Sequence, residues 1–412
     1  MVISREKQIS IVMSIPILNA IASTTQNYFS GIGSGDIRMV VILLFILVFF
    51  HKFYRDTLIN HLIVINLVYL SFTASFATDL PYTFSVLAKY SVSTILFSIG
   101  YYYIKNLKDY QRLLESYLFV LLIIVISIVV ANIFHLGSSD YLESTLYYGV
   151  ARVDITMQMA VVLLAVSPIF LFLKTKKVRL FVIILLLASF ILILLGIKRS
   201  AILALFIGYF IYLYASHISV KQVRQYIAIL FTLALFSPLY LNTLFERFLS
   251  RQEAGRFDLN QAPSEEARFM EVSRVITEYF DGDIGHKLFG SELFNYMEFG
   301  HTTRMLHTDY ATMFSGAGLI GLLLFLFIYL AIFRKILFYR KVFNKNKLMT
   351  SITAICLALL MAQLILGVGS TVHGIGIRAY IFLFIGASLG VLNRHYVYMK
   401  TKEKSHENIN RM

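Results

Sequence analysis

Two basic residues interrupt a long apolar stretch of this sequence. Lys198 and Arg199 stand at the junction of the apolar runs 179–197 and 199–216. An arginine guanidinium holds a phosphate through two parallel hydrogen bonds, a geometry that a lysine ammonium does not reproduce. The pair therefore predicts a phosphate-binding site, and the alternative is an ordinary contact with lipid headgroups.

A histidine is the second residue suited to chemistry. His307 directly precedes Thr308 and Asp309, where another apolar run begins. A neutral imidazole can accept a proton near neutral pH and so act as a general base. Asp309 is two residues away, so on a helix it projects from a different side and is no obvious partner for the imidazole. The sequence has no HExxH motif, P-loop or Rossmann fingerprint, so we expect neither a metal nor a cofactor.

Three more basic residues lie at or within the ends of apolar runs. Lys89 is about 10 Å inside the run 82–104, at about 1.5 Å of rise per helical residue. Such a charge faces a cavity or a partner, unless its side chain extends back to the interface. Arg152 and Arg378 stand at run ends, where arginine also serves as an interfacial anchor. Arg152 and Arg378, together with Arg38 at another run end, predict a positive cavity suited to an anionic lipid.

Arg268 belongs to the one long polar segment between apolar runs. Residues 264–280 show helical spacing of apolar side chains, which predicts a helix in this segment. Arg268 lies near its start and is a second candidate for binding phosphate. The alternative is a solvated helix on which Arg268 forms ion pairs with Glu265, Glu271 and Glu278.

The elements that position these residues are membrane-spanning helices. Of 412 residues, 58% are hydrophobic and 15% are charged, against about 25% charged in a typical soluble domain. Residues 180–197 contain no ionisable side chain and are long enough to cross the roughly 30 Å hydrocarbon core. The net charge of +14 comes largely from short loops between such runs, where basic residues orient helices. Nucleic acid is therefore not an expected partner.

Hydropathy predicts twelve spans, with the first retained rather than cleaved as a signal. They are residues 9–29, 38–53, 57–77, 82–104, 115–134, 152–173, 179–197, 199–216, 224–241, 307–333, 349–369 and 376–394. Lysine and arginine are concentrated in alternate loops, which places both termini in the cytoplasm. We therefore predict helices over 1–241, a large outer loop over 242–306, and three helices with a cytoplasmic tail over 307–412.

Three segments, in this order, resemble the bacterial O-antigen polymerase (Wzy) and O-antigen ligase (WaaL) superfamily. The first is Ile-Lys-Arg-Ser-Ala at 197–201. The second is Glu-Ala-Arg-Phe at 266–269, followed by Leu-Phe-Gly at 288–290. The third is His-Thr-Asp-Tyr at 307–310, followed by a glycine-rich helix at 316–321. The family has Asn where this chain has Thr308, and an acidic residue that ligases carry further along is absent, which favours the polymerase.

The resemblance implies an all-α polytopic fold with about twelve transmembrane helices, one large periplasmic loop and a GT-C-like glycosyltransferase architecture. It implies metal-independent, inverting transfer of a glycan from undecaprenyl pyrophosphate on the periplasmic face of the inner membrane. The acceptor is another lipid-linked repeat unit, and a Wzz-like chain-length regulator is an implied partner beside membrane lipid. Arg199 and Arg268 bind the pyrophosphate, His307 is the base, and Lys89, Lys198, Arg152, Arg378 and Asp309 complete the substrate site.

Two other functions remain open on the sequence. A ligase performs the same chemistry but transfers the glycan to lipid A-core. A flippase for lipid-linked sugars belongs to another class, and it predicts charges at mid-membrane depth and discontinuous helices in repeated halves.

Overall fold

The computed structural model describes most of the apolar runs. The described residues are 4–25, 40, 57–136, 146–149, 151, 154–196, 198–216, 267–294, 296–299, 302–306, 308–368 and 375–410. Two predicted spans, 38–53 (apart from residue 40) and 224–241, lie outside these residues. Each of the other ten predicted spans overlaps a helix of the structure.

Helices make up nearly all of the regular structure in the described residues. They are α1 (Arg5–Thr24), α3 (Leu58–Ala74), α4 (Leu80–Tyr103), α5 (Leu107–Ile133), α6 (Ile155–Ala165), the 3-10 helix η3 (Ser167–Leu171), α7 (Lys176–Leu195), α8 (Arg199–Ala215), α11 (Ala267–Asp281), α12 (Ile284–Phe289), α13 (Asp309–Val342), α14 (Lys347–Gly367) and α15 (Gly376–Asn410).

Length and hydropathy identify this chain as an α-helical polytopic membrane protein. Among the described residues, six helices are long and apolar enough to cross a bilayer: α4, α5, α7, α13, α14 and the first part of α15. Helix α3, the α6–η3 pair and α8 are shorter apolar helices. The apolar side chains on their outer surfaces include Phe72, Phe119 and Phe210, each more than half exposed, as expected for helices in contact with lipid.

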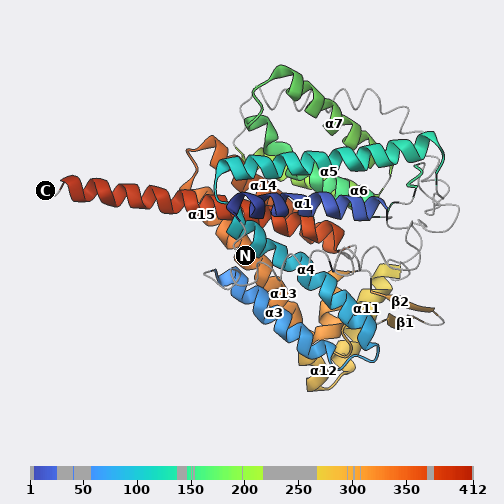
Figure 1. Ribbon diagram of the computed structural model, residues 1–412. Helices are drawn as coiled ribbons and strands as arrows, with labels where there is room; N and C mark the ends of the chain where they lie inside the picture. Colours follow the sequence, from blue (N-terminus) through green and yellow to red (C-terminus); the bar gives the residue numbers. More distant parts are fainter. Residues whose placement is uncertain are drawn as a thin grey trace.

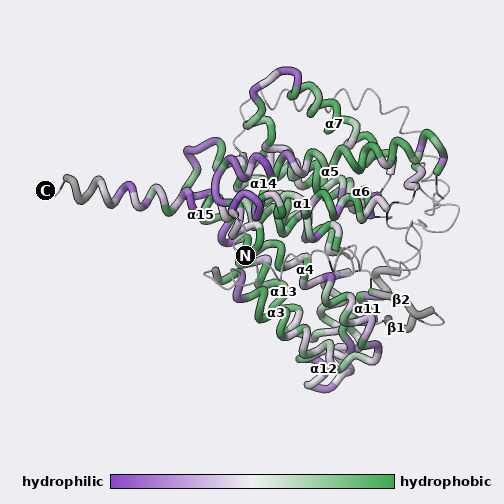
Figure 2. The backbone as a smooth tube through the Cα atoms, viewed as in Figure 1, coloured by the Kyte–Doolittle hydropathy of each residue, from purple (hydrophilic) through white to green (hydrophobic). Residues whose placement is uncertain are grey.

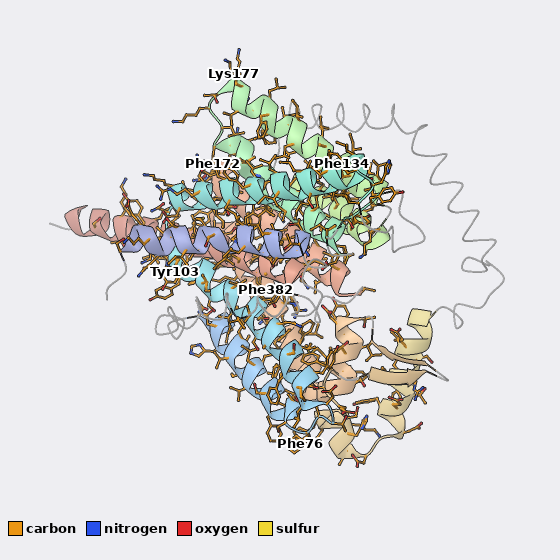
Figure 3. All side chains as sticks on the ribbon, turned by 45° about the vertical axis from the view of Figure 1, so that its right-hand side comes forward. Phe76, Tyr103, Phe134, Phe172, Lys177 and Phe382 are labelled. Atoms are coloured by element: carbon orange, nitrogen blue, oxygen red, sulfur yellow. The ribbon has the colours of Figure 1, made fainter. Side chains whose placement is uncertain are left out.

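The helices form two groups joined by α4 and α15 (Figure 1). Helices α1, α5, α14 and α15 run alongside one another, and α15 projects from the bundle toward the C-terminus. Helices α3, α4 and α13 lean away from them toward α11, α12 and a short β-hairpin. Side chains cover both groups, with Phe76 at the lower tip and Phe134 at the end of α5 (Figure 3).

Three glycines allow α4 and α15 to approach with backbone in contact with backbone. A Cβ atom at Gly386 would clash with the carbonyl of Phe97, and one at Gly390 would clash with the carbonyl of Tyr101. On α4, a Cβ at Gly100 would clash with the backbone of α15. Gly386 and Gly390 are four residues apart, the small-residue spacing that favours close helix association in membranes.

An arginine of α15 binds the C-terminal end of α4, at one end of the α4–α15 contact. Arg394 of α15 donates hydrogen bonds to the carbonyl oxygens of Tyr101, Tyr102, Ile104 and Gly390 at 3.0 to 3.2 Å. The last carbonyls of a helix lack partners within the helix, and they carry the negative end of its dipole. The guanidinium therefore satisfies the C-terminus of α4 and fixes its position along α15.

The β-hairpin was not predicted from the sequence. Strands β1 (Tyr296–Phe299) and β2 (Thr302–Met305) pair antiparallel, with Tyr296 opposite Met305. Two residues including Gly300 separate the strands in sequence, which is typical of a tight hairpin turn. The expected all-α fold class is confirmed, and the hairpin adds two short strands within the segment 242–306.

Adding a methyl group at the α4–α15 contact should destabilise the protein. We expect Gly386→Ala to lower the stability by about 1–3 kcal/mol, because the new Cβ must displace backbone. Gly285→Ala, in the exposed helix α12, is the control, since its nearest neighbour is the Asp283 side chain at 3.3 Å. Thermal unfolding of the two purified variants measures this, and equal melting temperatures would contradict it.

Candidate functional site

The N-terminal ends of four helices meet in one region. Ser200, at the start of α8, donates a hydrogen bond from Oγ to the Sδ atom of Met157 near the start of α6, at 3.4 Å. The side chain of Gln158 packs against Gly376, where α15 begins. The first turn of α15 contacts the first turn of α13 through an ion pair. Because a helix N-terminus is the positive end of its dipole, this region favours anions.

That ion pair joins Arg378 to Asp309, both without solvent exposure. The Nη2 atom of Arg378 donates to a carboxylate oxygen of Asp309 at 3.0 Å. The guanidinium also lies over the ring of Tyr90, 4.6 Å from its centroid. The alternative that Arg378 is an interfacial anchor is therefore wrong, since an anchor has its charge in contact with water or headgroups.

Hydrogen bonds fix the start of α13 directly after residue 307. Thr308 is the N-cap, and its hydroxyl accepts a hydrogen bond from the backbone N–H of Ala311 at 2.9 Å. The hydroxyl of Tyr310 donates to the carbonyl of Leu364 on α14 at 2.7 Å. Thr is one of the residue types favoured at a helix N-cap, because its hydroxyl accepts a hydrogen bond from a backbone N–H that has no partner within the helix.

The structure describes the side chains of some of the other predicted site residues, only the backbone of others, and none of the rest. Lys89 is half-buried on α4 and directly precedes Tyr90, whose ring contacts Arg378. Lys198 is the half-buried N-cap of α8. Arg199 and Arg268 are placed by backbone alone, as the first residue of α8 and the second residue of α11. Arg152 and His307 lie outside the described residues.

Helix α11 packs on the first turns of α13. Its Val275 is buried with Ala311, and the ring centroids of Tyr279 and Phe314 are 4.5 Å apart. Glu271, one turn before Val275, has no solvent exposure. The backbone position of residue 268 is three residues before Glu271, on the same side of the helix.

The alternative of a solvated α11 is thus wrong for one of its glutamates. Glu271 is buried, whereas Glu278 forms a partly exposed ion pair with Arg274 at 2.8 Å. A buried carboxylate requires compensation, so Glu271 belongs to the packed face of α11 rather than to its water-facing side.

The segment after α12 is pressed against a kink in α13. Gly318 has a φ of 66°, a left-handed conformation that breaks the regular helix, and a Cβ there would clash with the carbonyl of Leu288. Gly290, with a φ of 82°, is equally close to the backbone of Gly316. The amide of Ser291 donates to the carbonyl of Ser315 at 2.9 Å. Two segments of the family resemblance, 288–290 and 316–318, are therefore in direct contact.

Sequence reasoning missed the contacts of Tyr90 and Glu292 and the burial of Glu271, three residues that organise this region. Tyr90 follows Lys89 and contacts Arg378, and Glu271 follows Arg268 by one turn. Glu292 accepts hydrogen bonds from the amide and the hydroxyl of Thr78, between α3 and α4, and so attaches the segment after α12 to that turn. Their proximity in sequence to Lys89, Arg268 and the 288–290 segment was the available signal.

Comparisons with known proteins do not identify a function, so the function is inferred from the site. No protein-family model and no curated protein sequence matches this chain. Within the described part of the chain, no three His, Cys, Asp or Glu side chains lie close enough to hold a metal ion. Metal-free chemistry stays a prediction.

Removing one partner of the Arg378–Asp309 pair should destabilise the fold strongly. We expect Asp309→Asn to cost about 3–5 kcal/mol, because it leaves a buried guanidinium without its counter-charge. Adding Arg378→Met to Asp309→Asn should recover part of this loss. Arg274→Gln, which breaks the exposed pair on α11, is the control and should cost about 0.3–0.5 kcal/mol. Thermal unfolding tests this, and an unchanged melting temperature for Asp309→Asn would contradict it.

Proposed function

We propose that this chain is an O-antigen polymerase, or a polymerase of a related surface polysaccharide. It joins repeat units carried on undecaprenyl pyrophosphate. The observation that carries the proposal is the convergence of four helix N-termini, with Lys198 and Arg199 at the start of α8 and Arg378 in the first turn of α15. Lys89 lies on the neighbouring helix α4, directly before Tyr90, whose ring contacts Arg378. Helix N-termini and basic side chains bind phosphate groups, and a pyrophosphate-linked donor presents two of them.

In this mechanism, the hydroxyl oxygen of the acceptor sugar attacks the anomeric carbon of the donor. The bond from that carbon to the pyrophosphate oxygen breaks as the new glycosidic bond forms, and the configuration inverts. His307 takes the proton of the attacking hydroxyl. Arg199 and Arg268 stabilise the charge that develops on the departing pyrophosphate. The leaving group carries its own charge, so arginines serve where other enzymes use a metal ion.

The described contacts support roles for the remaining residues in this proposal. The Arg378–Asp309 pair and the Thr308 cap hold the start of α13, which His307 precedes in the sequence. Lys89, Lys198 and Arg152 contribute positive field toward the lipid phosphate. In this assignment Asp309 acts by holding Arg378 rather than by contacting the sugar.

The wider architecture belongs to the same proposal. The chain has twelve spans in a GT-C-like arrangement, with both termini in the cytoplasm and the site at the periplasmic face of the inner membrane. Its partners are the lipid-linked donor and acceptor, membrane lipid and a Wzz-like chain-length regulator.

The rival functions differ in what they require of the site. A ligase uses the same chemistry, so the geometry supports it equally, and the polymerase is favoured by the family pattern alone. A flippase calls for charges at mid-membrane depth. The buried pair instead lies in the first turns of α13 and α15, at helix ends, which favours chemistry at one face.

Alanine substitutions test the assigned roles. We expect Arg199→Ala, Arg268→Ala and His307→Ala each to abolish the long polysaccharide ladder when they replace the natural gene, at equal abundance in the membrane. Loss of a general base alone costs about 10²–10⁴ in rate. Arg274→Ala is the matched control, because it removes an exposed arginine from the same helix as Arg268. Normal ladders from all three variants would contradict the assignment.

A deletion strain separates polymerase from ligase. Loss of a polymerase leaves a single repeat unit on the lipid core, because ligation still proceeds, whereas loss of a ligase leaves the core bare. Gel electrophoresis of the lipopolysaccharide distinguishes the two patterns, and a bare core would replace our proposal with the ligase.

A further inference from the structure

A basic cavity lies at the opposite end of the bundle from the candidate site. Its volume is about 460 Å³, within the range of small-molecule sites. The α4–α5 loop contributes Lys105, the first turn of α5 contributes Lys108, and α15 contributes Arg394 and His395. Figure 2 shows hydrophilic segments gathered at this end, where α15 leaves the bundle. The cavity therefore belongs to the end that the predicted topology places in the cytoplasm.

The charge facing this cavity is strongly positive. None of the described residues that line it is acidic. The nearby carboxylate of Asp109 is already compensated, because it accepts a hydrogen bond from Arg5 at 2.9 Å. Arg394 adds charge, although its Nη atoms donate to backbone carbonyls. Lys105 and Lys108 are exposed, so they are the groups placed to contact an anion.

Apart from Asn106, the remaining walls of the cavity are largely apolar. Leu107, Met349 and Val391 line it beside the basic residues, and Tyr398 stands more than half exposed at its edge. A free phosphate has no apolar part and would gain nothing from these walls. A phospholipid has an anionic headgroup for the lysines and a glycerol-acyl part for the apolar wall. Basic pockets between membrane helices bind anionic headgroups for this reason.

We propose that this cavity binds the headgroup of an anionic phospholipid, with Lys105 and Lys108 contacting its phosphate. The proposal does not depend on the proposed function. The positive-inside rule explains why lysines are present at this end, but it applies equally to lysines that line no cavity. Lys176 and Lys177, at the start of α7, do not line this cavity: both are exposed, and Lys177 points away from the bundle (Figure 3).

A single tryptophan can report on the site. The chain contains no tryptophan, so in the Tyr398→Trp variant all tryptophan fluorescence comes from one residue at the edge of the cavity. The purified variant is titrated with brominated phosphatidylglycerol or brominated phosphatidylcholine, whose bromines quench nearby tryptophan. We expect the anionic lipid to quench at a much lower mole fraction than the zwitterionic one.

Charge removal then tests the two lysines. Adding Lys105→Gln with Lys108→Gln should weaken quenching by phosphatidylglycerol about tenfold or more. The matched double change, Lys176→Gln with Lys177→Gln, should leave it unchanged. Equal quenching by both lipids, or equal weakening in the two double variants, would overturn the proposal. Inorganic phosphate at millimolar concentration should not displace the lipid, and displacement would assign the cavity to a soluble phosphate compound instead.

A second measurement keeps the proposal testable if the tryptophan variant does not fold. Native mass spectrometry of the unmodified protein, released from detergent with mixed lipids, should show phosphatidylglycerol retained in preference to phosphatidylcholine. Equal retention of the two lipids would overturn the proposal.

Discussion

Two opposite charges without access to water impose the main constraint on this structure. A guanidinium or a carboxylate alone in an apolar bundle costs several kcal/mol, so Arg378 and Asp309 stabilise the fold only while they remain together. Arg378 lies on α15 and Asp309 on α13, so the ion pair fixes the position of each helix along its axis relative to the other. Tyr90 of α4 stacks on the same guanidinium, and the region of converging helix starts is thereby built around one electrostatic contact.

The glycine contact between α4 and α15 makes this arrangement possible. With Gly386 and Gly390 against the backbone of α4, the helices approach closely enough for Tyr90 to reach Arg378. Arg394 binds the terminal carbonyls at the other end of α4. The contact of Tyr90 with Arg378 and the contacts of Arg394 therefore both fix the register between α4 and α15. Van der Waals packing sets the separation of the helices, and the two arginines set their alignment.

Much of the helix layout could be predicted from hydropathy, because apolar runs of about twenty residues have few other structures available. Ten predicted spans overlap described helices, and the helix in the outer loop was predicted from its spacing. The pairing of Asp309 with Arg378 could not be predicted, since 69 residues separate them and an arginine at a run end also fits an anchor. The burial of Glu271 was missed for a related reason: helical spacing shows which residues share a face, but not what covers it. His307 and Arg152 lie outside the described residues, so their predicted roles rest on sequence.

The kink at Gly318 divides α13 into two mechanical parts. The N-terminal part contacts α11 and α12 and carries Asp309 of the ion pair, whereas the longer C-terminal part supplies most of the apolar length that can cross a bilayer. Spanning helices tilt when bilayer thickness changes, and a glycine with a positive φ is a natural pivot because it lacks a Cβ. A helix that tilts with the lipid can therefore end in a segment that does not, and the same protein can keep one site geometry in membranes of different thickness.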